Sequence, residues 1–190
     1  MDGKEFFEKY KGDKEMCKHL QNFDVGTLKN WEAESVSQFS PGVITDDEII
    51  YQQILDPTNL DDSKTSLKPM AFDTASSIGM STNRLVGASM ADIILRGHAR
   101  AKSYNDAYPS APQRSLWGFV PIPVSSVRKI VSDFSNDRGL FVYDTATQHD
   151  PSHADICQTI KEPRNFRSIR FTLYDLVKDT VVKLQDISTV

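Results

Sequence analysis

Residues 145–158, TATQHDPSHADICQ, hold the densest set of side chains that could do chemistry. The segment follows an apolar run, LFVY, and it contains His149, Asp150, His153, Asp155 and Cys157. Histidine suits general acid–base catalysis near neutral pH, and loops that follow strands often display catalytic groups on a rigid scaffold. We expect His153 to act as the base and Asp155 to orient it.

Two other interpretations of this segment remain open. His149 and His153 could bind a metal ion, with Asp155 or Cys157 as a third ligand. Pro151 disfavours helical geometry at the residue before it, so the two histidines cannot share a helical face, and we predict no metal. The structural interpretation is an Asp-Pro-Ser turn before a polar strand.

Residues 70–84, MAFDTASSIGMSTNR, gather hydroxyls, an amide and a guanidinium around Gly79. Backbone N–H groups and an arginine can hold a phosphate in such a loop. We expect Ser77 and Arg84 to bind an anion and Ser81 to form the central catalytic pair with His153. The segment has neither the G-x-G-x-x-G nor the P-loop pattern, and we predict no cofactor. The alternative is an ordinary serine-rich loop.

Residues 96–100, RGHAR, place Arg96 and Arg100 four positions apart in a predicted helix. This spacing puts both guanidinium groups on one helix face. The pair could face a phosphate, or it could belong to a solvated helix surface.

Three stretches, IIYQQILDP, PMAFDTASSIGMSTNRL and DPSHADIC, resemble a group of small uncharacterised bacterial proteins. In that group an arginine-rich strand precedes an "A-F…L-S-V" segment, and a "P-A-H-A-x-I" segment follows late in the chain. Gln52 and Gln53 stand here where the group's pattern has arginine. The resemblance implies a bacterial or phage setting and directs attention to Phe72, Ser81 and His153, but it implies no reaction.

The elements that must position these residues follow from apolar spacing. β-Branched and aromatic runs predict strands, and apolar residues at helical spacing predict helices. The predicted strands are 48–55, 67–72, 80–85, 116–122, 140–143 and 154–160. The predicted helices are 3–21, 28–39, 90–103, 124–134 and 166–184. Since strands and helices alternate without a regular βαβ rhythm, we predict an α+β fold with a small mixed or antiparallel sheet of short strands.

Charge is unevenly distributed along the chain. The 190 residues have a formal net charge of -4, and residues 1–48 alone hold 6 lysines and 11 acidic residues. The composition is globular and excludes a collagen-like, coiled-coil or broadly disordered chain. The breaker Ser40-Pro41-Gly42 predicts a boundary between an acidic helical segment, 1–40, and an α+β core, 41–190.

Apolar patterning also bears on location. The sequence has no run of 18 apolar residues that could span a bilayer, and its first residues have no apolar stretch typical of a signal peptide. Cys17 and Cys157 lie far apart in the sequence. We therefore expect a cytoplasmic protein with free thiols and no membrane contact.

Two function classes follow. The first is a transferase or hydrolase that acts on a nucleotide or nucleic-acid phosphate in a toxin or phage-defence setting. The second is a non-catalytic inhibitor or adaptor that binds a basic protein partner through acidic residues 1–48.

Overall fold

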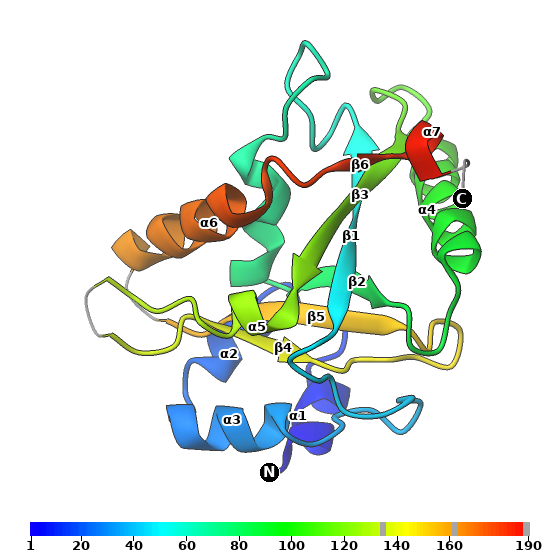
Figure 1. Cartoon of the computed structure of the whole chain (residues 1–190). Helices are drawn as coiled ribbons and strands as arrows, with labels where there is room; N and C mark the ends of the chain where they lie inside the picture. The colour runs from blue at the N-terminus through cyan, green and yellow to red at the C-terminus, as the bar shows by residue number, and fades with distance from the viewer. Residues whose placement is uncertain (134–135, 161–162, 188–190) are drawn as a thin grey trace.

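A computed structural model of the chain describes residues 1–133, 136–160 and 163–187, with only the backbone of residues 163–166. Within these residues six strands form one antiparallel sheet in the order β4-β5-β2-β1-β3-β6 (Figure 1). The predicted α+β fold is confirmed. The strands are β1 (Ile49–Asp56), β2 (Met80–Arg84), β3 (Ser115–Pro123), β4 (Leu140–Tyr143), β5 (His153–Gln158) and β6 (Val182–Lys183).

Helices surround the sheet on both faces. The α-helices are α1 (Gly3–Lys9), α2 (Met16–Leu20), α3 (Val25–Glu32), α4 (Met90–Ala107), α5 (Val124–Val127), α6 (Pro163–Val177) and α7 (Leu184–Ile187), and η1 (Pro69–Ser76) is a 3-10 helix. None of the helices in the described ranges is long and apolar enough to cross a membrane.

The alternation of side chains along each strand separates the interior into distinct cores. One sheet face carries Ile50, Met80, Val120 and Ile156, which pack beneath η1, α5 and α6 in the largest core. On the other face α4 covers Leu55 of β1 and Leu116 and Phe119 of β3. The same face of β4 and β5 lies under the N-terminal helices (Figure 1).

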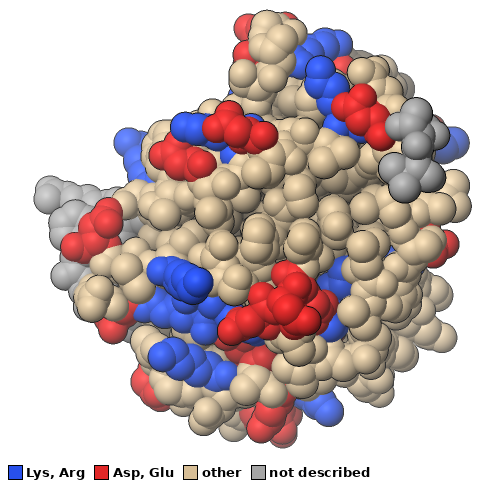
Figure 2. All heavy atoms as spheres, viewed as in Figure 1, with Lys and Arg blue, Asp and Glu red and all other residues tan. Residues whose placement is uncertain are grey.

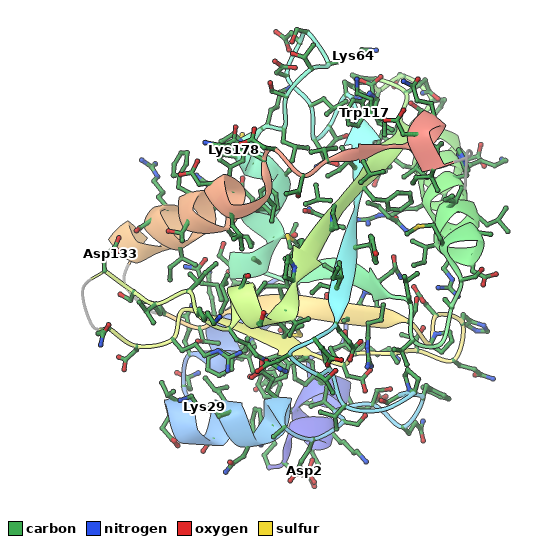
Figure 3. The ribbon with its side chains drawn as sticks, viewed as in Figure 1. Asp2, Lys29, Lys64, Trp117, Asp133 and Lys178 are labelled. Carbon is green, nitrogen blue, oxygen red and sulfur yellow. The ribbon has the colours of Figure 1, made fainter. Side chains whose placement is uncertain are left out.

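The acidic N-terminal segment shares a hydrophobic core with the strands. Phe6 and Trp31 pack in one cluster with Phe141, Tyr143 and Cys157. The cluster lies at the end of the molecule where Figure 3 shows Asp2 and Lys29, opposite the loop that carries Lys64. Residues 1–40 therefore supply one wall of the folded core.

A buried carboxylate also fixes the N-terminal segment in place. Glu32, 6% exposed, accepts the backbone N–H of Val142 at 2.7 Å. The same carboxylate pairs with Arg138 and lies 3.2 Å from Arg128. A buried charge is tolerated when it is paired and hydrogen-bonded, and Glu32 meets both conditions.

Several predicted elements differ in the structure. The predicted strand 67–72 is largely replaced by η1, because Pro69 suits the first turn of a helix. The predicted helix 3–21 is divided into α1 and α2, and Gly12 between them has a φ of 78°. The predicted helix 28–39 ends at Glu32, 124–134 ends at Val127, and 166–184 ends at Val177.

Helix α4 forms where the sequence places it. The Ser89 hydroxyl accepts the backbone N–H of Asp92 at 3.2 Å, and the Asp92 carboxylate accepts that of Ser89 at 2.9 Å. This capping box satisfies two free donors of the first turn. A side chain at Gly97 would place its Cβ 2.8 Å from Leu116, so glycine allows α4 to approach β3 closely.

Candidate functional site

A groove of about 680 Å³ runs between α1, residues 36–39 and residues 145–147. Its apolar walls include Phe7, Met16, Val36, Phe39 and Ile78. Lys4, Glu5, Glu8 and Lys11 belong to α1 and its following turn, and the polar side chains opposite are Thr145, Thr147, His153 and Asp155. Apolar walls combined with convergent polar groups are typical of a ligand site.

Thr145 connects the two predicted catalytic residues. Its hydroxyl donates to Asp155 Oδ2 at 2.8 Å, and Nδ1 of His153 lies 2.9 Å from the same hydroxyl oxygen. The backbone carbonyl of Thr145 lies 3.3 Å from Nδ1. Because the hydroxyl proton is directed to the carboxylate, Nδ1 must carry the proton and donate it to Thr145.

This arrangement determines which ring nitrogen of His153 can accept a proton. Nε2 lies 3.9 Å from Asp155 Oδ1, which is too far for a hydrogen bond. The His153 side chain is 24% exposed, and the residue lines the groove. A neutral His153 therefore offers the Nε2 lone pair as a base beside the groove.

Strands β2 and β5 bring Ser81 to the same sheet face as the other two predicted residues. Ser81 pairs directly with Asp155, and Asn83 pairs with His153. Ser81 and His153 are consequently diagonal neighbours, a relation that separates residues by about 7–8 Å. Among the residues that the structure describes, the Ser81 hydroxyl makes no hydrogen bond, so the predicted direct pair with His153 is not formed.

Arg84 has a different role from the one predicted. Its side chain is 1% exposed, and it forms two hydrogen bonds with Glu48, at 2.8 and 2.9 Å. It also donates to the carbonyls of Gly42 and Val43 at 2.6 and 3.2 Å. Burial alone would raise the pKa of Glu48, but the hydrogen bonds and charge of Arg84 lower it below its usual value. An external anion cannot reach this guanidinium.

Ser77 also serves the fold. Its hydroxyl donates to the carbonyl of Thr74 at 3.3 Å, and its own carbonyl accepts the backbone N–H of Cys17 at 2.7 Å. Ser77 precedes β2 and Arg84 ends it, so the two predicted anion contacts lie at opposite ends of the strand. The predicted anion site at Ser77 and Arg84 is not assembled.

The turn before His153 has the structure that the Asp-Pro-Ser sequence predicts. Asp150 Oδ1 accepts from the Ser152 hydroxyl at 2.7 Å and from its backbone N–H at 3.2 Å. Arg96 of α4 donates to both residues, at 2.6 and 2.7 Å, and Asn83 donates to the other oxygen of Asp150 at 3.0 Å. This network fixes the start of β5 and therefore the position of His153.

The residues considered as metal ligands are divided between different environments. His149 is exposed, whereas Cys157 is fully buried in the core that also contains Cys17. Burial, and then the neighbouring Cys17 thiol, raise the pKa of Cys157. In the part of the chain that the structure describes, no three His, Cys, Asp or Glu side chains are grouped so that they could hold a metal ion.

Much of the acidic charge in residues 1–48 is used within the chain. Glu32 and Glu48 pair with buried or partly buried arginines, and Asp46 pairs with Arg128. Asp2 and Asp24 cap α1 and α3. On the face viewed in Figure 2, acidic and basic side chains are intermixed, and no single-sign patch covers that face.

Comparisons with protein-family models, curated proteins and solved structures found no match. The resemblance to the small bacterial proteins stays a prediction. The sequence analysis missed most of the groove lining, including Lys4 and Lys11, Thr145 at the start of the histidine segment, and the apolar residues Phe39 and Ile78. The last two carry a signal only in the structure, where they are large apolar side chains that are 38% and 44% exposed.

Proposed function

We propose that this chain is a hydrolase or transferase that acts on a nucleotide or nucleic-acid phosphate, with Nε2 of His153 as its general base. The observation that carries the proposal is the contact between Thr145 and Nδ1 of His153, because it orients the ring and leaves Nε2 unprotonated in the neutral imidazole. A general base must lie within reach of the proton it removes, and His153 lines the groove in which a substrate would bind.

In the proposed reaction Nε2 takes a proton from a water or an acceptor hydroxyl as its oxygen attacks the phosphorus atom. The positive charge that forms on the imidazole is stabilised by Asp155 through the Thr145 hydroxyl. The bond from phosphorus to the leaving oxygen breaks, and His153 then returns the proton to that oxygen. Ser81 does not line the groove, so the attack is assigned to the water or acceptor and not to Ser81.

Lys4 and Lys11 take the phosphate-binding role in this proposal, because both line the groove and Arg84 does not. Phe7 and Phe39 form part of the apolar wall against which a base could pack. The test is turnover of a panel of nucleotides and phosphodiesters by the wild-type chain and by a Lys4→Gln, Lys11→Gln double variant. We expect the double variant to raise KM. An unchanged KM in that variant would remove the lysines from the site.

The non-catalytic adaptor remains the alternative, with the exposed acids Glu8 and Glu34 as its contacts. We would test it by comparing partner capture by the wild-type chain and by a Glu8→Gln, Glu34→Gln variant. Loss of a specific partner together with no turnover of any phosphate ester would favour the adaptor. The cytoplasmic location and the bacterial toxin or phage-defence setting also stay predictions.

A further inference from the structure

A second cluster of functional groups lies on α4, outside the groove. Arg96, Arg100 and Tyr104 follow one another at four-residue spacing, and Tyr108 caps the helix one step further on. This spacing makes each of these side chains a neighbour of the next along the helix surface. The rings of Tyr104 and Tyr108 are 4.9 Å apart, so aromatic and cationic groups form one continuous stripe.

Arg114 joins this stripe from the loop that follows α4. Its guanidinium carbon lies 3.3 Å from the centre of the Tyr104 ring. The side chain of Asn105 holds the backbone of Arg114 in place: it donates to the Arg114 carbonyl at 2.9 Å and accepts the Arg114 N–H at 2.7 Å. The loop is thus fastened to α4, and Arg114 is held over Tyr104, one helical turn from Arg100.

Within the described residues, the two arginines beside Tyr104 differ from most other arginines in forming no salt bridge. Arg84, Arg96, Arg128, Arg138 and Arg170 each pair with a carboxylate. Within residues 1–133, 136–160 and 163–187, neither Arg100 nor Arg114 forms an ion pair or a side-chain hydrogen bond. Their donors are therefore available to a ligand.

Like charges are concentrated at this position. Although Arg100 is an exposed residue, desolvation lowers the pKa of its guanidinium, the charge of Arg114 lowers it further, and the charge of Asp155 acts in the opposite direction. Two neighbouring cations repel each other, and the attraction between Arg100 and Asp155 is smaller than this repulsion. A bound anion would remove this repulsion.

We propose that Arg100 and Arg114 bind the phosphate of a nucleotide whose base stacks on Tyr108. Guanidinium groups bind phosphate through paired hydrogen bonds. The Tyr108 residue is 57% exposed, and an exposed aromatic ring next to bound phosphate can stack on a base. The site shares no residue with the groove and does not depend on catalysis by His153.

The test measures binding of ADP, inorganic phosphate and a short single-stranded oligonucleotide to the full chain by calorimetry. The variants are Arg100→Gln, Arg114→Gln and Tyr108→Leu, with Lys102→Gln as the matched control, because Lys102 is an exposed cation on α4 that pairs with Asp106. Each arginine variant should weaken ADP binding about tenfold or more, and the control should not. Tyr108→Leu should weaken ADP binding at least about fivefold and leave phosphate binding unchanged.

The ligand series separates the sources of the phosphate. Tighter binding of ADP than of inorganic phosphate supports a nucleotide as the ligand. Still tighter binding of the oligonucleotide shows that this nucleotide is part of a single-stranded nucleic acid. Equal affinity for ADP and phosphate would overturn the stacking role of Tyr108. No saturable binding, or equal ADP affinity in the wild type and an Arg100→Gln, Arg114→Gln double variant, would overturn the site. Because His153 is intact in every variant, these results do not depend on the proposed catalysis.

Discussion

Nδ1 of His153 lies 2.9 Å from the hydroxyl oxygen of Thr145, and that hydroxyl donates to Asp155 at 2.8 Å. This chain of contacts assigns the proton of the neutral ring to Nδ1 and leaves Nε2 unprotonated. The arrangement makes a single hydroxyl responsible for the orientation of the candidate base.

Thr145→Val should disturb the tautomer of His153 while keeping the shape of the side chain. Without the hydroxyl, Nδ1 keeps only the backbone carbonyl of Thr145 at 3.3 Å, and Asp155 loses a donor. We expect ¹⁵N NMR to show a protonated Nδ1 and an unprotonated Nε2 in neutral wild-type His153, and a mixture of both tautomers in Thr145→Val. The same tautomer distribution in both proteins would show that the hydroxyl does not orient the ring.

Breaking the buried ion pair of Arg84 and Glu48 should lower the free energy of unfolding strongly. Glu48→Gln leaves Arg84 buried without its carboxylate, which costs about 3 kcal/mol, at the low end for a broken buried pair. The low end applies because Asp144 remains 3.7 Å from Arg84. Urea unfolding measures the loss. The neighbouring exposed Asp47→Asn should change stability by less than about 0.5 kcal/mol, and equal effects of the two variants would contradict the buried-pair assignment.

The same pair should contribute to acid sensitivity. The folded pKa of Glu48 is lowered. Its contribution to the free energy of unfolding is therefore fully present above the unfolded pKa of about 4.3. This contribution is lost as the pH falls through the lower, folded pKa. We expect the free energy of unfolding of the wild type to fall more steeply with decreasing pH than that of Glu48→Gln. If the free energy of unfolding depends on pH in the same way for the two proteins in this range, Glu48 does not contribute to the acid sensitivity.

Residues 1–40 should be required for folding, because they cover Phe141, Tyr143 and Cys157. Trp31→Ala removes a 6% exposed side chain and should cost about 3–5 kcal/mol. Lys29→Ala on the exposed side of α3 is the control and should be nearly neutral. If a chain that lacks residues 1–40 unfolds cooperatively and keeps its stability, the segment is instead a separable appendage.

Alkaline pH should destabilise the chain through two buried groups. Burial is the largest cause of the raised pKa values of Cys157 and Tyr143. The unfolded chain ionises these groups at about 8.5 and about 10, so stability is full below these values and falls as the pH rises above them. Cys157→Ala should delay the loss until tyrosine begins to ionise. An unchanged alkaline profile in this variant would show that Cys157 does not contribute.

Local sequence signals predicted most of the elements but few of the long-range contacts. LFVY at 140–143 is a strand and Ser89 caps α4, because both depend on neighbours in sequence. The partner of Arg84 lies 36 residues earlier in the chain, and no local pattern connects the two. Thr145 was overlooked for a similar reason, since its role depends on how β4 and β5 pair.

The register of β2 and β5 explains why Ser81, His153 and Asp155 share a face and why Ser81 and His153 do not pair directly. His153 and Asp155 lie two residues apart on β5 and therefore share one strand face, and the pairing of β2 with β5 adds Ser81 to that face. The alternation of side chains could predict the shared face, but it could not predict the diagonal offset between Ser81 and His153. The offset changes the expected serine pair into a histidine that is oriented by a threonine.

The most direct test of the proposed function is the rate of phosphate-ester cleavage or transfer by the wild type, His153→Gln and His149→Gln. His149 is the matched control because it is an exposed histidine four residues away. With the best substrate of the panel, we expect His153→Gln to lower kcat by about 10²–10⁴-fold, the contribution of a positioned general base, without unfolding the chain. We expect His149→Gln to be as active as the wild type. Equal rates for all three folded proteins, or no turnover of any phosphate ester by the wild type, would contradict the role of His153 as general base.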